Sequence, residues 1–196
     1  DWIIVSVLPE QVCDVLSEIN CRAEQKIISL AAGVSLEQLH TWAAPATDII
    51  RVIPMPPIEH GLGPVAMCPA DAGTEALFEK IGTCVAVSDE AQFNLFGAAS
   101  ALMADFFDQV SGVTQWMSEK GLQTSTAARY TTALYYALAD LTVRQSAEGL
   151  HEMSEACQTP GGLNAQFLAR RNKLGTKKSL TEGLDDILAR LESATN

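Results

Sequence analysis

The sequence changes character near residue 89, and this change limits the folds that the chain can adopt. Before it, short apolar runs alternate with helical patterns, which is the arrangement typical of strand–helix–strand units. After it the strand pattern disappears, and long apolar segments with helical spacing follow. We therefore predict an α/β domain over residues 1–88 and an all-helical domain over residues 89–196.

Five segments of the first part have the pattern of buried strands. They cover residues 2–7, 26–30, 48–54, 63–67 and 83–89. Helical patterns lie between them, at residues 10–19, 36–42 and 71–81. Pro9 stands at the start of the first helix and Ser35 is a candidate N-cap of the second. Because the strands are apolar almost throughout, we expect a largely parallel sheet that is covered on both faces.

The second part predicts a series of helices that are unusually apolar for their length. They cover residues 91–120, 126–149, 151–157, 163–174 and 178–191. Helices of this kind usually bury more than one face, so we expect a homodimer formed through the helical domain. The alternative is a monomer in which the helices pack on the α/β domain.

Charge and cysteine content narrow the classes of function. The 196-residue chain has a net charge of −11 and no long basic stretch, which argues against a nucleic-acid partner. No apolar run reaches the ~20 residues that span a bilayer, so we expect no membrane partner. Five cysteines without a C-x-x-C pair and three scattered histidines predict no metal site. Scattered, unpaired cysteines are typical of a reduced, cytoplasmic protein.

The stretch TPGGLNAQFLARRNKLG, at residues 159–175, places two glycines directly before a helix. Either the turn requires glycine dihedral angles, or a ligand must approach the N–H groups at the helix start. In the second case, the N–H groups of Gly161, Gly162 and Leu163 could receive a small carboxylate. In the first, Thr159 caps the helix locally and no ligand is needed.

Five segments, taken in order, resemble the pyrroline-5-carboxylate reductase family. They are DWIIVSVLPEQVCDVLSEI, KIISLAAGVSLEQL, IIRVIPMPPIEHGLG, LFEKIGTCVAVSDE and QTPGGLNAQFLARRNKLG. The resemblance implies part of a Rossmann-type NAD(P)-binding domain, followed by a helical dimerisation domain like the C-terminal domain of 6-phosphogluconate dehydrogenase. It also implies NAD(P)H-dependent reduction of pyrroline-5-carboxylate to proline. Because the chain starts within a strand and lacks a glycine-rich dinucleotide turn, we expect an N-terminal part to precede it.

The same resemblance implies roles for particular residues. The cofactor, NADP or NAD, would contact the turns after the first two strands, at Val7, Leu8, Pro9, Ala31, Ala32 and Gly33. The substrate would bind at Thr159, Gly161, Gly162 and Leu163, and Asn164 and Ser100 would be the catalytic side chains. The alternative for the strand-end turns is that small residues merely fit there.

Several of these positions depart from the family's motifs. Leu163 and Asn164 replace two threonines, Leu8 replaces a lysine and Met55 an asparagine, and SALMAD at residues 100–105 replaces Gly-Ser-Gly-Pro-Ala-Tyr. An asparagine amide can donate a hydrogen bond but cannot relay a proton as a hydroxyl can. Two functions therefore stay open: a reductase of pyrroline-5-carboxylate or a related imino or keto acid, and a homologue that binds NAD(P) or a ligand without turnover. A third possibility is a dimer with a structural role and no cofactor.

Overall fold

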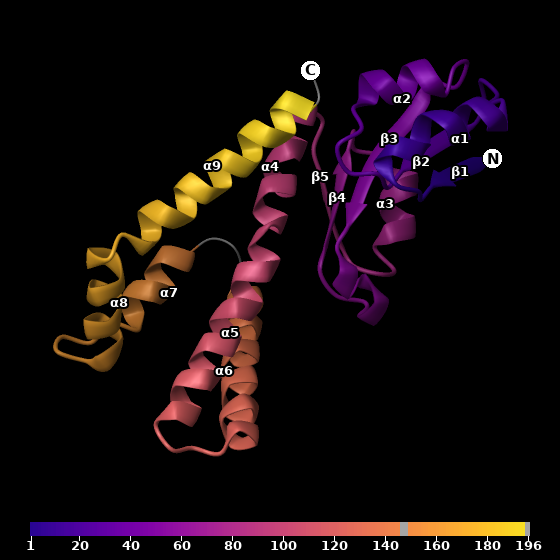
Figure 1. The fold of residues 1–196 in the computed structure, drawn as a ribbon. Coiled ribbons are helices and arrows are strands. Elements are labelled where there is room, and N and C mark those ends of the chain that lie inside the picture. The colour runs from indigo at the N-terminus through magenta and orange to yellow at the C-terminus, as the bar shows by residue number, and fades with distance from the viewer. Residues whose placement is uncertain (146–148, 195–196) are drawn as a thin grey trace. The chain divides into compact units, whose positions relative to one another are not determined.

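The computed structural model describes residues 1–145 and 149–194, which divide into two compact units (Figure 1). The first unit comprises Asp1–Ser100 together with the end of the chain from Leu184 onward. The second comprises Ala101–Gly183. The domain boundary between residues 88 and 89 stays a prediction.

The first unit contains a five-stranded sheet in which the strands lie in chain order (Figure 1). The strands are β1 (Trp2–Val5), β2 (Lys26–Ser29), β3 (Asp48–Pro54), β4 (Pro64–Cys68) and β5 (Thr83–Ala86). Three pairings are parallel and one, between β3 and β4, is antiparallel. The expected largely parallel sheet is thus confirmed. The antiparallel pairing follows from the short 3-10 segment η2 (Pro56–His60), since a parallel return needs a crossover of a dozen or more residues.

Helices cover both faces of this sheet, as the apolar strands predicted. After the 3-10 turn η1 (Pro9–Gln11), α1 (Val12–Ile19) and α2 (Leu36–Trp42) pack on one face, against Ile27 and Ile49. On the other face, α3 (Ala72–Phe78) packs through Phe78 against Ile28 and Ile50. Successive strand residues point to opposite faces, so a sheet covered twice needs apolar residues at every position.

The start of α2 is determined locally by its sequence. The Ser35 hydroxyl accepts a hydrogen bond from the Gln38 N–H at 3.2 Å, and the Gln38 side chain accepts one from the Ser35 N–H at 2.9 Å. This reciprocal arrangement is a capping box, and it confirms the prediction of Ser35 as N-cap.

In the described part of the chain, six helices follow the sheet. They are α4 (Glu90–Ser100), α5 (Leu102–Glu119), α6 (Thr124–Arg144), α7 (Leu150–Ala156), α8 (Leu163–Lys173) and α9 (Thr176–Ala194). The prediction of one helix over residues 91–120 was wrong, because α4 and α5 are separated at Ala101. At this point the Ser100 hydroxyl donates to the Gly97 carbonyl oxygen at 2.7 Å, a bond of the kind that competes with the helical ladder and bends helices. The predicted helix over residues 126–149 corresponds to α6; its expected end falls partly on residues 146–148, outside the described residues.

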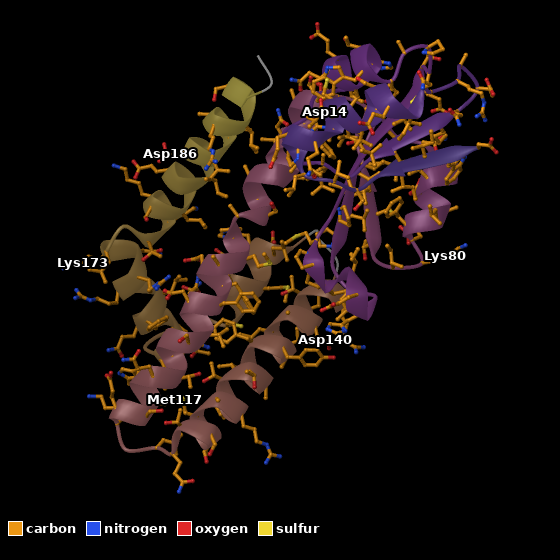
Figure 2. All side chains as sticks on the ribbon, turned by 45° about the vertical axis from the view of Figure 1, so that its right-hand side comes forward. Asp14, Lys80, Met117, Asp140, Lys173 and Asp186 are labelled. Carbon is orange, nitrogen blue, oxygen red and sulfur yellow. The ribbon has the colours of Figure 1, made fainter. Side chains whose placement is uncertain are left out.

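Within the second unit, α5 and α6 lie side by side as an antiparallel pair (Figure 1). The rings of Phe106 and Tyr135 meet edge to face with their centres 5.6 Å apart. Near the other end of the pair, the Thr131 hydroxyl lies 3.8 Å from the sulfur of Met117, which Figure 2 labels. Ala127 and Thr131 are fully buried, so small residues allow the close approach of these two helices.

Candidate functional site

The turns that follow β1 and β2 leave the sheet at the same edge. Val5 and Ser29, the last residues of these strands, are aligned in the parallel register. The Leu30 N–H then donates to the Val5 carbonyl oxygen at 2.9 Å, so the two chain segments stay adjacent beyond the strands. The structure thereby brings the residues predicted for the cofactor, 7–9 and 31–33, to one rim. Ligands of open α/β sheets bind outside this carboxyl edge.

The backbone at this rim is accessible to a ligand. Gly33 has a φ of +78°, and no atom lies within 4 Å of the place that a Cβ would occupy. Ala32 is exposed, whereas Ala31 is buried and anchors the turn. Small residues and open space along a strand-end turn suit the close approach of a dinucleotide to the backbone. Leu8, in the other turn, is 59% exposed.

The turn before α8 requires both of its glycines. Gly161 has a φ of +73°, in the left-handed region that favours glycine. At Gly162 a Cβ would lie 2.3 Å from Thr159 Oγ1 and 3.0 Å from the Thr159 carbonyl oxygen. The Gly162 N–H donates to that same carbonyl oxygen at 2.8 Å. Turn geometry therefore accounts for both glycines, and Gly162 directs its N–H into the turn.

Thr159 does not cap α8 through its side chain, so the turn-geometry alternative was wrong in that detail. The N-cap residue is Gly162, without a side-chain hydrogen bond to the helix start. The first backbone bond of the helix runs from the Gln166 N–H to the Gly162 carbonyl oxygen, at 3.1 Å. The N–H groups of residues 163–165 precede this bond, at the positive end of an eleven-residue helix. This end of α8 can receive an anion.

Leu163 and Asn164 lie in the first turn of α8 and are both exposed. Leu163 is 84% exposed, an unusual place for a large apolar side chain. The Asn164 amide nitrogen donates to the Cys157 carbonyl oxygen at 3.1 Å, which ties the start of α8 to the end of α7. An amide group has two N–H protons and a carbonyl oxygen, so this bond uses only part of its capacity.

The predicted site residues fall into two groups, one in each unit. The rim turns and Ser100 belong to the first unit, and residues 159–164 belong to the second. Ser100 is the last residue of α4 and half-buried, and its hydroxyl proton is directed to Gly97.

Sequence reasoning missed a buried ion pair near the rim. Arg51 in β3 is 2% exposed, and its Nη1 lies 2.5 Å from Oε1 of Glu90, the first residue of α4. The guanidinium also lies over the Phe93 ring, 4.6 Å from its centre. Cys68 pairs with Arg51 across the strands; burial raises the pKa of its thiol, and the negative charge of Glu90 raises it further. An arginine inside the apolar run IIRVIP is the signal that could have indicated this pair.

The structure also bears on metal ligation and on membrane-spanning helices. Among the residues that it describes, no group of three or more His, Cys, Asp or Glu side chains could hold a metal ion. Likewise, no helix in residues 1–145 and 149–194 is long and apolar enough to cross a membrane. All five cysteines lie in these ranges and are free thiols.

Comparison with known proteins gives related sequences and structures along the whole chain. Over 202 residues the chain is 24% identical to pyrroline-5-carboxylate reductase of Vibrio alginolyticus, covering 98% of this chain and 74% of that protein. The structure of a pyrroline-5-carboxylate reductase from Coxiella burnetii matches all of this chain and 76% of its own, with a TM-score of 0.84 and 21% identity. That of Plasmodium falciparum pyrroline carboxylate reductase, solved with NADP bound, matches all of this chain and 78% of its own, with a TM-score of 0.86 and 17% identity.

No protein-family model matches the chain. The sequence and structure matches nevertheless confirm the resemblance found in the five segments. They also confirm the fold class, a Rossmann-like sheet followed by helices.

Proposed function

We propose that this protein, a relative of the pyrroline-5-carboxylate reductases, uses NADPH or NADH to reduce a small imine that carries a carboxylate. Pyrroline-5-carboxylate is the substrate that the similarity favours, with proline as the product. The observation that supports this most strongly is similarity along 98% of the chain to a curated reductase, together with a fold shared with an NADP-bound one.

The rim of the sheet is the proposed place for the cofactor. Residues 7–9 and 31–33 would hold it through backbone groups, and the open space at Gly33 leaves room for it. When bound, the nicotinamide cofactor supplies the hydride for the imine carbon. The task of the protein is then to hold the imine close by and to provide a hydrogen-bond donor for its nitrogen.

The first turn of α8 is the proposed place for the substrate's carboxylate. The N–H groups of residues 163–165 and the helix dipole favour a negative charge there. Gly161 and Gly162 shape the turn, and Thr159 supplies the carbonyl oxygen that closes it. The Asn164 amide would donate to the imine nitrogen or its carboxylate, and the Ser100 hydroxyl would hydrogen-bond to the substrate. Reduction of C=N to CH–NH consumes one hydride and one proton, and the proton would come from water, since an amide does not release one at neutral pH.

Activity and NADPH binding of the full-length protein test this function together. We expect NADPH oxidation with pyrroline-5-carboxylate, and an Asn164→Ala variant with kcat/KM lowered roughly 10- to 100-fold by the loss of a hydrogen bond to the reacting group. Gln166→Ala, on the same helix, is the matched control and should retain full activity. An Asn164→Thr variant, which introduces a hydroxyl, should keep at least the wild-type rate.

Two results would contradict the reductase proposal in different ways. NADPH binding without turnover of any imino or keto acid would establish the alternative, a homologue that has lost catalysis. The departures at residues 163 and 164 are the feature that favours this alternative. Failure to bind either NADPH or NADH would exclude both.

We also propose that the protein is a homodimer formed through its helices. On α6, a stripe of apolar side chains at helical spacing is exposed: Tyr130, Leu134, Leu138 and Leu141. Soluble monomers rarely expose contiguous apolar surfaces of this kind, whereas subunit interfaces bury them. The five free thiols favour a reducing, cytoplasmic environment.

A further inference from the structure

One carboxylate joins three elements of the first unit. Oε1 of Glu90, the first residue of α4, accepts a hydrogen bond from Arg51 Nη1 in β3 at 2.5 Å. The same oxygen accepts the backbone N–H of Leu36, the first residue of α2, at 2.8 Å. Both bonds are charge-assisted, and such bonds are about twice as strong as neutral ones.

The Arg51 guanidinium makes a second contact with α4 in addition to its bond with this carboxylate. It lies over the face of Phe93, one turn along α4 from Glu90. Arg51 Nε is buried and has no hydrogen-bond partner among the described residues. Buried ion pairs add little to stability compared with apolar side chains of similar size, and a buried N–H without a partner is unfavourable. The pair is therefore better explained by the geometry that it maintains than by stability.

That geometry concerns the rim turn of residues 31–33. Before the turn, the Leu30 N–H donates to the Val5 carbonyl oxygen. Beyond the turn, the Leu36 N–H donates to the Glu90 carboxylate. The turn is thus fixed at both ends, on β1 and on α4. Without Glu90, the second end would keep the capping box of Ser35 and the buried side chain of Val34, but it would lose this hydrogen bond to α4.

We propose that Glu90 and Arg51 are positioning residues that hold the 31–33 turn in the conformation that receives the dinucleotide. This inference rests on the proposed function, because it assigns the turn to the cofactor. It predicts that the pair controls cofactor affinity and the mobility of the turn, and has little effect on the affinity for the imino acid.

Hydrogen exchange and NADPH titration of the intact protein test the proposal. Glu90→Ala should speed amide exchange in residues 31–36 about tenfold and weaken NADPH binding by a similar factor, since it removes a charge-assisted hydrogen bond. The KM for the imino acid should stay within about twofold. Glu90→Gln keeps an oxygen that can accept the Leu36 N–H, so it should recover most of both properties. Asp89→Ala is the matched control: Asp89 accepts the Ala91 N–H at the same helix start, and its loss should leave residues 31–36 unchanged.

The double variant Arg51→Met/Glu90→Leu separates positioning from stability. It removes both charges, so we expect an unfolding midpoint near that of the wild type, together with faster exchange in residues 31–36 and weaker NADPH binding. The opposite pattern, a lowered midpoint with unchanged NADPH affinity, would overturn the proposal. Unchanged exchange of residues 31–36 in Glu90→Ala would overturn it as well. Failure of the wild type to bind NADPH would instead refute the proposed function, and with it the cofactor role of the turn, whatever the exchange data show.

Discussion

At the scale of single residues, the turn before α8 shows how two adjacent glycines can be needed for different reasons. Gly161 adopts a left-handed φ of +73°, which a side chain would strain. Gly162 has an ordinary φ, but the place of a Cβ is occupied by Thr159. The sequence posed the choice between turn geometry and ligand approach; the dihedral angles and the contact with Thr159 decide that geometry requires both glycines.

A Gly162→Ala substitution should therefore destabilise the protein by about 1–3 kcal/mol, because the new methyl group overlaps Thr159. Urea unfolding measures this change. Adding Thr159→Ala, which removes the Oγ1 atom at 2.3 Å, should recover part of the loss, while the contact with the carbonyl oxygen at 3.0 Å persists. Gly112→Ala in α5 is the control, since nothing lies within 4 Å there; it should stabilise by about 0.5–1 kcal/mol. Equal effects at positions 112 and 162 would contradict this account.

At the scale of elements, one ion pair connects β2 to the start of α3. Asp71 is the N-cap of α3 and accepts the Thr74 N–H at 2.7 Å. Lys26 Nζ lies 2.6 Å from the same carboxylate oxygen and 5.3 Å from the centre of the Trp2 ring. The hydrogen bond from Lys26, and then that from the Thr74 hydroxyl at 2.6 Å, lower the pKa of Asp71 from 3.8 to about 2. Folding thus favours the ionised form of this carboxyl group.

The stability that Asp71 contributes should depend on pH in the acid range. Its pKa is lower in the folded state than in the unfolded state, so its contribution is fully present above about pH 4 and is lost as the pH falls towards 2. Asp71→Asn keeps the cap but removes the charge, so it should lower the free energy of unfolding by about 1 kcal/mol at neutral pH. Solvent screening makes this loss smaller than the pKa shift alone would give. Unfolding midpoints of variant and wild type, measured from pH 7 to pH 2, should converge at the acid end.

Asp48→Asn is the control for this prediction. Asp48 lies 3.5 Å from the same lysine and is half exposed, so its substitution should change the unfolding midpoint less. A difference that is constant with pH would contradict the assignment.

The sequence predicted the positions of helices and strands correctly where the local signals are strong. Ser35 and Gln38 fix the start of α2, and the apolar run at residues 48–54 coincides with β3. The break between α4 and α5 was missed because no proline marks it, and the serine hydroxyl that turns back to Gly97 is only visible in the folded backbone. The antiparallel direction of β4 was also not predicted, since a strand's apolar pattern is the same in both directions.

At the scale of the whole molecule, the exposed stripe on α6 is a feature that a single copy of the chain leaves unexplained. Leu138 is 52% exposed and lies between Leu134 and Leu141 on the same face of the helix. We expect this stripe to lie in the proposed homodimer interface.

A Leu138→Glu variant should shift the protein from dimer to monomer, because a carboxylate in an apolar interface loses its hydration without gaining a partner. Light scattering coupled to size-exclusion chromatography measures the mass. Arg129→Glu, on the opposite face of α6, also changes the charge and should leave the dimer intact. A wild-type protein that is monomeric at micromolar concentration, or a Leu138→Glu variant that remains dimeric, would contradict this placement.

The sequence by itself determined the positions of the strands and of most helices along the chain, the sheet covered on both faces and the family that the chain resembles. These properties depend on local periodicity, capping and motif order, all of which are written along the chain. Only the tertiary structure revealed that Glu90 binds both Arg51 and the start of α2. The reason is physical: these residues are 39 and 54 positions from Glu90, and a contact over such a separation depends on how strands and helices pack, which no local pattern encodes.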